Sequence, residues 1–313
     1  GVRADITPQA ARIDAHLMNR RGVDRLCYTG SVLRTRPEGL MRTREPFQVG
    51  AELFGHAGVE GDAEIQQLML EVLKACGIEQ ITLDLGHVGI FGALARDAKL
   101  PEALERELFV ALQSKDTARV AQSVRTLDVS VGAAFQRLAE LSGGSEVLAR
   151  ARQSLPALPA VRAALDDLQH ISELLLAAAK AGVKVTFDLA ELRGYDYHSG
   201  MVFAAYSPGY ADAIAKGGRY DEVGKAFGRA RAATGFSLDL RDIVNHLPPA
   251  EAARAILAPH NGDTALQRVV HELRSKGEVV IYDLPGHAVY RDELGCDREL
   301  VLEAAHWRVQ SLK

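Results

Sequence analysis

A helical pattern that ends at a glycine and leads directly into a strand pattern occurs three times in this sequence. From 62 to 76 apolar residues fall at helical spacing, Gly77 follows, and residues 81–85 alternate between apolar and polar. The same order returns at 158–190 and at 264–284. The unequal distances between the three argue against an internal repeat. Helices and strands are therefore expected to be mixed along the chain.

A long stretch with helical periodicity separates two groups of strand signals. It covers 99–182 and has breaks near Ser114, at Gly143-Gly144 and near Pro156. We therefore predict one core formed by residues 1–98 and 183–247, interrupted by a helical insertion at 99–182. Because helices split the strands of this core, an antiparallel sheet flanked by helices, an α+β fold, is favoured.

Turn signals organise the second half of the chain. Ser207-Pro208-Gly209 lies between two apolar runs and predicts a hairpin turn. After Pro248-Pro249, a short strand pattern at 255–257 is followed by a helix and further strands. These signals predict a small C-terminal α/β domain at 250–313.

A helix pattern begins close to the start of the sequence. Thr7 is expected to cap it, Pro8 suits its first position, and Gly22 is expected to end it. Residues 1–6 are then expected to be the end of a strand whose partners lie upstream, so N-terminal sequence is expected to be missing.

Composition excludes several classes of protein. The length of 313 residues suggests about two domains. With 37 Lys and Arg against 41 Asp and Glu, the net charge of −4 excludes a basic protein that coats nucleic acid. The apolar run at 174–179 is far shorter than the roughly 18 residues of a membrane span. Three separated cysteines, Cys27, Cys76 and Cys296, form neither a metal-binding spacing nor an even disulfide set, which predicts a reducing cytoplasm and no metal.

Two segments of the first half could bind a ligand. The loop from Arg34 to Arg44 contains four arginines, whose planar guanidinium groups grip carboxylates and phosphates, although a solvated loop is the alternative. In the strand that follows, Gln48, Gly50 and Glu52 share one face and could form a cup for an amine or imidazole. The alternative is an edge strand with its polar face in water.

A third segment is rich in side chains that suit a polar pocket. Residues 191–200 combine Arg, Tyr, Asp and His ahead of an apolar strand, and residues 216–221 read Lys-Gly-Gly-Arg-Tyr-Asp. A Gly-Gly pair lets the backbone approach a ligand closely. Taken singly, His198 is more typical of a structural histidine and the glycine pair of an ordinary loop.

In this order, these segments resemble the histidyl-tRNA synthetase family of class II aminoacyl-tRNA synthetases, from residue 1 to about 246. The matching residues are Arg-Gly-x-Asp-Tyr at 193–197, Gly-Gly-Arg-Tyr-Asp at 217–221 and Ala-Thr-Gly-Phe at 233–236. The resemblance implies a class II synthetase-like sheet of six or more strands. It implies a histidine-binding set at Asp5, Thr7, Gln48, Glu52, Arg193, Tyr197, His198 and Tyr220, with His198 in place of a family tyrosine, and possible anion or phosphate contacts at Arg34 and Arg219.

The same resemblance points away from catalysis. Arg36 stands where the family has the glutamate that orients ATP, and Asp239 and Asp242 replace a glycine and the arginine at the γ-phosphate. Loss of ATP activation is therefore expected, although a one-residue shift would let Arg241 substitute. The chain after Val244 is also shorter than the roughly 100 residues typical of a separate tRNA-binding domain.

A synthetase-like core that holds histidine without activating it resembles the regulatory subunit of ATP phosphoribosyltransferase. This implies a non-catalytic partner of the short-form catalytic subunit at the first step of histidine biosynthesis, which activates that subunit and mediates feedback inhibition by histidine. It also implies self-dimers in a hetero-octamer, with no cofactor, nucleic acid or membrane. The alternatives are an active histidyl-tRNA synthetase or aminoacyl ligase, and a structural scaffold with a vestigial pocket. Histidine binding at a subunit interface also stays open.

Overall fold

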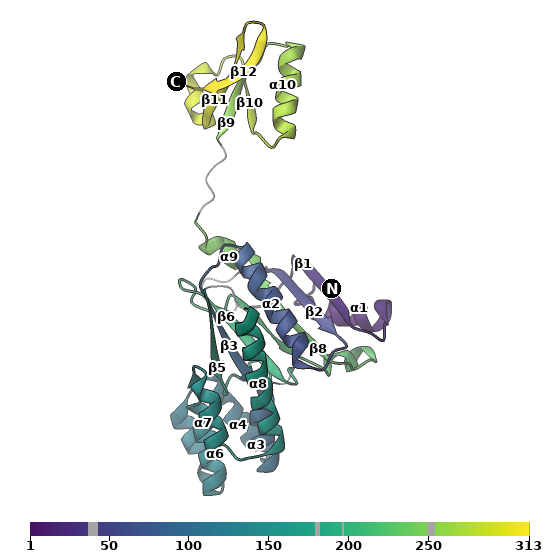
Figure 1. The fold of residues 1–313 in the computed structure, drawn as a ribbon, viewed down its shortest axis with the longest axis vertical. Helices are drawn as coiled ribbons and strands as arrows, with labels where there is room; N and C mark the ends of the chain where they lie inside the picture. Colours follow the sequence, from purple (N-terminus) through teal and green to yellow (C-terminus); the bar gives the residue numbers. More distant parts are fainter. Residues whose placement is uncertain (37–42, 179–181, 196, 249–253, 313) are drawn as a thin grey trace. The chain divides into compact units, whose positions relative to one another are not determined.

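The computed structural model describes residues 1–36, 43–178, 182–195, 197–248 and 254–312. The chain forms two compact units, Gly1–Leu247 and Pro248–Lys313 (Figure 1). Part of the arginine-rich loop predicted as an anion clamp, residues 37–42, lies outside the described residues.

A large sheet runs through the first unit. Among the described residues it has eight strands in the order β1-β2-β8-β7-β6-β3-β5-β4. In that order the strands are Asp24–Ser31, Phe47–Phe54, Ala233–Asp239, Ala215–Arg219, Met201–Tyr206, Ile81–His87, Val183–Asp188 and Ser142–Gly143. The predicted sheet flanked by helices is confirmed, including the hairpin between β6 and β7. One pair differs from the antiparallel expectation: β3 and β5 are parallel, because the helices between them return the chain to the same edge.

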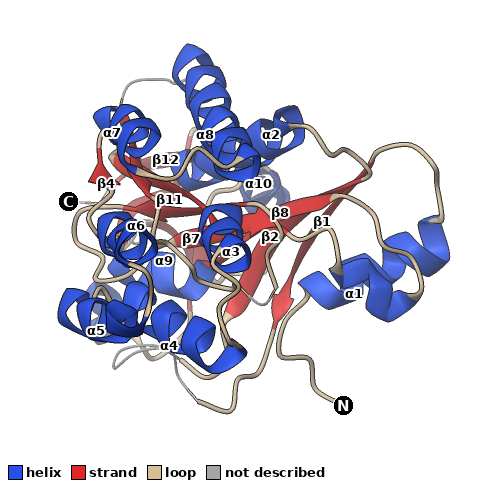
Figure 2. Cartoon of the chain, turned by 90° about the horizontal axis from the view of Figure 1, so that it is seen from below, coloured by secondary structure: helices blue, strands red, loops and turns tan. Residues whose placement is uncertain are grey.

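Two long helices cover one face of the sheet. α2 (Val59–Ala75) packs on β2, β7 and β8, and α8 (Pro159–Ala178) packs on α2, β3 and β6 (Figures 1 and 2). Both show the predicted apolar stripe, and Met69, Leu73 and Leu168 are fully buried. Gly77 follows the first helix with φ 84°, a left-handed conformation that favours glycine.

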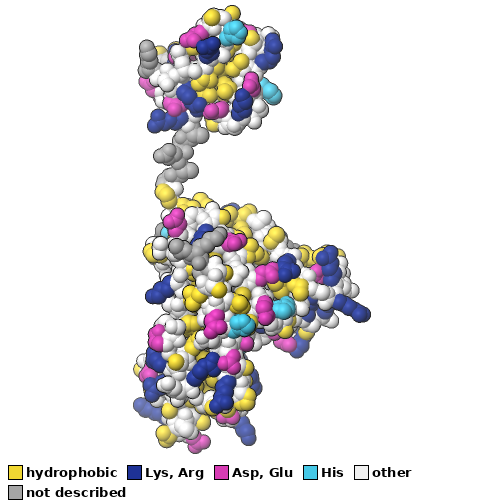
Figure 3. All heavy atoms as spheres, viewed as in Figure 1, with side chains coloured by type: hydrophobic (Ala, Val, Ile, Leu, Met, Phe, Trp, Pro, Cys, Tyr) yellow, Lys and Arg dark blue, Asp and Glu magenta, His cyan; other side chains and the backbone are white. Residues whose placement is uncertain are grey.

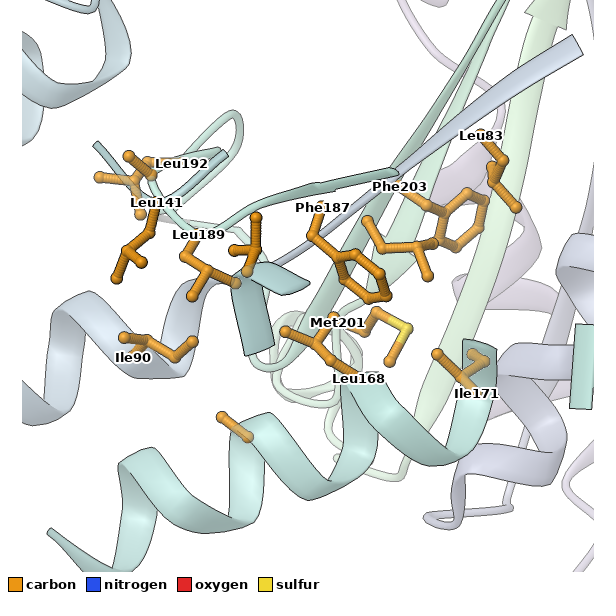
Figure 4. Packing of buried hydrophobic residues seen from close by; sticks show 14 of the residues in the cluster. Leu83, Ile90, Leu141, Leu168, Ile171, Phe187, Leu189, Leu192, Met201 and Phe203 are labelled. Carbon is orange, nitrogen blue, oxygen red and sulfur yellow. The ribbon is translucent and has the colours of Figure 1, made fainter. Parts of the chain in front are cut away.

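The helices of the 99–182 region share one hydrophobic core with the sheet. α3 (Val88–Asp97) follows β3 directly, and α4 (Glu102–Gln113), α5 (Thr117–Ser123), α6 (Val129–Ala139) and α7 (Glu146–Ser154) precede α8. Ile90 of α3 lies near Leu189, and Leu168 of α8 lies near Phe187 and Met201 (Figure 4). The predicted breaks coincide with the end of α4, with β4 and with the α7–α8 connection.

The first helix differs from the expectation. α1 (Thr7–Ile13) passes into a π-helical turn, η1 (Asp14–Met18), which ends at Asn19 with φ 44° and not at Gly22. Thr7 does not cap α1; the Asp5 carboxylate accepts the Thr7 N–H at 3.2 Å. The predicted strand at residues 1–6 is also wrong: all six residues are described and none is in a strand.

The second unit is a small α/β domain. Its described strands form one sheet in the order β10-β9-β11-β12, packed on a single helix, α10 (Thr264–Ser275). The strands are Val280–Asp283, Ala255–Pro259, Cys296–Glu303 and His306–Ser311. On the face of each unit seen in Figure 3, acidic and basic side chains are interspersed. In neither unit does a helix of the described residues have the length and apolar character needed to cross a membrane.

Candidate functional site

A cavity of about 300 Å³ opens over the middle of the large sheet. Ala51 and Leu53 of β2 belong to the core that packs on α2, so Glu52 projects from the opposite face into the cavity, as the strand pattern predicts. Strands β6, β7 and β8, the residues before α1 and the 191–198 segment complete the walls. Polar and charged lining residues are Asp5, Thr7, Glu52, Glu191, Arg193, Tyr197, His198, Lys216, Tyr220 and Ser237.

The Glu52 carboxylate lies at the bottom of the cavity and is almost completely buried. Its Oε1 accepts hydrogen bonds from the hydroxyls of Thr7 and Tyr28, each at 2.9 Å, and its Oε2 accepts one from Tyr220. Burial raises the pKa of Glu52 to about 7, while these three hydroxyl donors oppose the shift. A cationic ligand group would therefore find a partner that is half ionised near neutral pH.

Two glycines make room for this arrangement. Gly235 of β8 lies opposite Glu52, and a Cβ atom at Gly235 would overlap the Glu52 Oε2. Gly50 of β2 lies opposite Tyr28, and a Cβ there would come within 2.5 Å of the Tyr28 ring. The Glu52 and Tyr28 side chains can lie flat across the sheet only because these two positions lack a side chain.

Asp5 lines the cavity and is held by Gln48. The Gln48 Nε2 donates to Asp5 Oδ1 at 2.7 Å, and its Oε1 accepts the Ile6 N–H at 2.9 Å. Gln48 itself is buried and lines the neighbouring smaller cavity in place of this one, where the sequence predicted a direct ligand contact. Its place is behind Asp5, where it fixes the residues that lead into α1.

Arg193 lies in the 191–198 segment and keeps part of its guanidinium available. Its Nε and Nη2 donate to the Glu191 carboxylate, and Nη2 also donates to the Tyr206 hydroxyl at 2.7 Å. Among the described residues none accepts a hydrogen bond from Nη1, and the side chain is 43% exposed. Nη1 can therefore bind an anionic ligand group while Glu191 and Tyr206 fix the guanidinium plane.

Aromatic rings connect these two regions. Tyr197 stacks on Tyr220 with 5.3 Å between ring centroids, and His198 meets Tyr197 edge-on at 5.1 Å. The His198 Nδ1 lies 3.1 Å from the carbonyl oxygen of Arg193, which can only accept, so Nδ1 carries the proton. Burial lowers the pKa of His198, which leaves a neutral ring with Nε2 as a hydrogen-bond acceptor.

Arg219 does not belong to an anion site, in contrast to the expectation from the sequence. Its side chain is buried and turns away toward α2, where it donates to both the Asp62 carboxylate and the backbone oxygens of His56 and Gly58. With a further contact to Asp221, all five guanidinium N–H groups are used. Arg219 therefore attaches β7 to the start of α2.

Each of the two units of the chain matches a known family model. A family model described as histidyl-tRNA synthetase matches residues 1–243, and one described as the ATP phosphoribosyltransferase subunit HisZ C-terminal domain matches residues 253–310. The ATP phosphoribosyltransferase regulatory subunit of Methylobacillus flagellatus is 57% identical over 99% of this chain and 79% of the relative. The chain belongs to the family of ATP phosphoribosyltransferase regulatory subunits.

A second relative and a solved structure support this assignment to the family. The ATP phosphoribosyltransferase regulatory subunit of Ralstonia nicotianae is 53% identical over 100% of this chain and 80% of the relative. The crystal structure of an ATP phosphoribosyltransferase regulatory subunit/histidyl-tRNA synthetase from Bacillus halodurans superposes with a TM-score of 0.83. It is 27% identical, with 95% of this chain and 78% of that chain covered. The resemblance predicted from the sequence motifs is confirmed.

In this regulatory-subunit fold, a smaller cavity of about 70 Å³ lies beside the first one and contains Arg34, Lys216 and Asp239. The Asp239 carboxylate accepts the N–H of Phe47 at 3.0 Å and that of Arg241 at 3.1 Å, so it caps α9 (Leu240–His246). The Arg241 side chain pairs with Glu45 at 3.4 Å. The cavity that contains Arg34, a predicted anion contact, thus also contains a carboxylate with a structural role.

Four polar or charged residues at the larger site were not expected from the sequence: Glu191, Lys216, Ser237 and Tyr28. Glu191 and Lys216 occur in segments already recognised as rich in polar residues, and both line the cavity. Tyr28 was not considered, although it contacts Glu52. The signal for Tyr28 is Gly50, because a glycine inside a strand often marks the close approach of another group.

Proposed function

We propose that this protein is a non-catalytic subunit that binds histidine in the cavity around Glu52. In this proposal it activates a short-form catalytic ATP phosphoribosyltransferase subunit at the first step of histidine biosynthesis and mediates feedback inhibition by histidine. Family membership supports the regulatory role.

The observation that carries the histidine assignment is the placement of opposite charges in one small cavity. Glu52 supplies a buried acceptor at the bottom, and Arg193 presents an open Nη1 donor from the 191–198 segment. A volume of about 300 Å³ suits a ligand of amino-acid size. We assign Glu52 and Thr7 to the amine or ring of histidine and Arg193 to its carboxylate, with Asp5 as a further acceptor. Tyr197, His198 and Tyr220 form the remaining wall, and Gln48 acts through Asp5.

The smaller cavity supports the absence of ATP activation. A phosphate placed beside Asp239 would meet a carboxylate that is already needed to cap α9. Two like charges about 4 Å apart repel by about 4 kcal/mol at an effective dielectric constant near 20. Arg34 and Lys216 also line this cavity and offset part of the repulsion, but Arg241 is turned toward Glu45 and does not add to them.

Regulation requires an assembly with two states. Histidine can shift an equilibrium only if it binds one state of the complex more tightly than the other. We propose a cytoplasmic hetero-octamer of four catalytic and four regulatory chains, built on dimers of this subunit. With its net charge of −4, the chain is not proposed to bind nucleic acid. Neither a metal nor a cofactor is part of the proposal.

Calorimetry of histidine binding to the assembled complex tests this function. Arg193→Ala is expected to weaken binding at least tenfold, because it removes the charged partner of the ligand carboxylate. Arg137→Ala is the matched control. Arg137 of α6 forms an exposed ion pair with Glu140, the residue that follows the helix. Unchanged affinity of the Arg193 variant would show that histidine binds elsewhere, for example at a subunit interface.

Two further measurements separate the alternatives. Histidine-dependent exchange between ATP and pyrophosphate by the purified chain would establish an active synthetase or ligase and overturn the proposal. Assembly with the catalytic subunit that persists while histidine has no effect would indicate a scaffold with a vestigial pocket.

A further inference from the structure

The described residues between Asp188 and His198 have two sides with different surroundings. One side carries Arg193, Tyr197 and His198, which line the cavity. The other side is buried in the core shared with the helical region, through residues such as Leu189 and Leu192 (Figure 4). The same short stretch of backbone therefore contacts both the proposed ligand site and the helices.

Two polar contacts attach this segment to α4 and to the residues just after α4. The Tyr195 hydroxyl donates to Glu105 Oε1 at 2.9 Å, near the start of α4. Just beyond the end of α4, Lys115 forms an ion pair with Asp188. The Tyr195 ring is packed between Phe91 and Phe109, with centroid distances of 5.2 and 5.5 Å.

Hydrogen bonds make the cavity side of the segment one unit. Gly194 has φ 70°, and its carbonyl accepts the N–H groups of Tyr197 at 2.8 Å and His198 at 2.7 Å. The Arg193 carbonyl accepts from the His198 ring. These hydrogen bonds link the backbone next to Tyr195 to both Arg193 and His198.

We infer that Tyr195 is a positioning residue through which the helical region controls the affinity of the cavity for histidine. Tyr195 does not line the cavity; its hydroxyl holds Glu105 and thereby fixes the turn that places Arg193 and His198. Because binding free energies are reciprocal, bound histidine in turn stabilises the contact between the turn and α4. This inference rests on the proposed function, since it concerns histidine at the same site.

The test is a set of calorimetric titrations of the full chain with histidine. Tyr195→Phe keeps the ring between Phe91 and Phe109 and removes only the hydroxyl, and it is expected to weaken binding about 3- to 10-fold. Glu105→Ala is expected to cause the same loss, and Glu105→Gln, which keeps an acceptor oxygen, to bind nearly as the wild type. The Tyr195→Phe, Glu105→Ala double variant is expected to lose no more than either single variant.

Tyr210→Phe is the matched control, because the Tyr210 hydroxyl donates to the Ile243 carbonyl outside this segment. Its affinity for histidine is expected to equal that of the wild type. Hydrogen exchange adds a readout that a merely structural role would not move: histidine is expected to slow exchange of α4 amides in the wild type and not in Tyr195→Phe.

The outcomes separate the two levels of the argument. If both Tyr195→Phe and Glu105→Ala bind histidine with wild-type affinity, the role of Tyr195 is overturned and the histidine site stays intact. The same conclusion follows if histidine protects the α4 amides equally in the wild type and in Tyr195→Phe. A wild-type chain and complex that bind no histidine overturn the proposed function, and the inference with it.

Discussion

The Thr7 hydroxyl donates a 2.9 Å hydrogen bond to Glu52 Oε1 across 45 positions of sequence. Thr7 is the first residue of α1, and Glu52 lies on β2 with its carboxylate buried. This contact connects the start of a helix to the charge at the bottom of the cavity. Thr7 does not cap its own helix because it is the first residue inside α1, where Ile6 occupies the N-cap position.

Thr7→Val is therefore expected to affect the site more than the helix. Valine has a similar shape and lacks the donor, so Glu52 loses one of the groups that stabilise its charge. We expect a loss of about 1–2 kcal/mol in the free energy of unfolding at pH 8 and weaker binding of histidine. Urea unfolding and calorimetry measure the two effects; Thr117→Val, at the start of α5, is a control with no contact to Glu52. A helix-capping role would instead leave histidine affinity unchanged.

The raised pKa of Glu52 predicts opposite pH dependences for stability and binding. In the folded state this pKa is about 7, above the ordinary value of 4.5, so folding favours the protonated form. The contribution of Glu52 to stability is therefore complete below pH 4.5 and is lost as the pH rises through 7. Glu52→Gln, which cannot ionise, is expected to be more stable than the wild type at pH 8 by up to about 3 kcal/mol, a difference that disappears near pH 4.

Histidine binding is expected to respond in the other direction. The ionised Glu52 attracts a cationic ligand group, so affinity should fall as the pH is lowered below about 7. Glu52→Gln should bind histidine weakly at every pH and lose this dependence. Calorimetry between pH 6 and 8, a range that includes the Glu52 pKa of about 7, measures this pH dependence of binding. An affinity that is flat over this range in the wild type would exclude a Glu52 contact with the ligand cation.

Gly235→Ala is expected to remove histidine binding by changing the position of Glu52. The added methyl group would overlap the Glu52 carboxylate, which must rotate away from the Tyr220 hydroxyl. The same methyl group would also lie 2.8 Å from the Ala51 carbonyl oxygen, so the backbone must shift as well. We expect affinity to fall more than tenfold and the free energy of unfolding to fall with it. Gly22→Ala is the matched control, since nothing lies near its Cβ position. Unchanged binding in Gly235→Ala would mean that the observed Glu52 rotamer is unimportant.

The buried ion pair of Arg219 and Asp62 is expected to act on stability alone. Arg219→Met leaves the Asp62 carboxylate buried without its partner and should cost about 3–5 kcal/mol in the free energy of unfolding. Arg219→Met combined with Asp62→Leu should recover most of this loss, because no unpaired charge remains. Urea unfolding of the three variants measures this. Weaker phosphate or nucleotide binding by folded Arg219→Met would restore the anion role expected from the sequence.

Patterns within one element were predicted correctly from the sequence. The stripes of α2 and α8, the glycine that follows α2 and the alternation of β2 depend on neighbours up to four positions away. The same alternation correctly placed Glu52 on the polar face of β2. Motif order then identified the synthetase-like fold, and seven of the eight residues predicted to bind histidine line the cavity, with Gln48 as the exception.

The partners of individual side chains were decided by the tertiary structure. Whether Thr7 caps α1 or binds Glu52, and whether Arg219 meets a ligand or Asp62, depends on groups 45 and 157 positions away. Gln48 and Tyr28 have their roles because strand pairing places one behind Asp5 and the other opposite Gly50. The sequence by itself determined most of the elements, the buried faces and the family, because these follow from local periodicity and motif spacing. Only the packed sheet decided which polar groups satisfy one another, because a buried donor or acceptor must find its partner among the residues that register brings within reach.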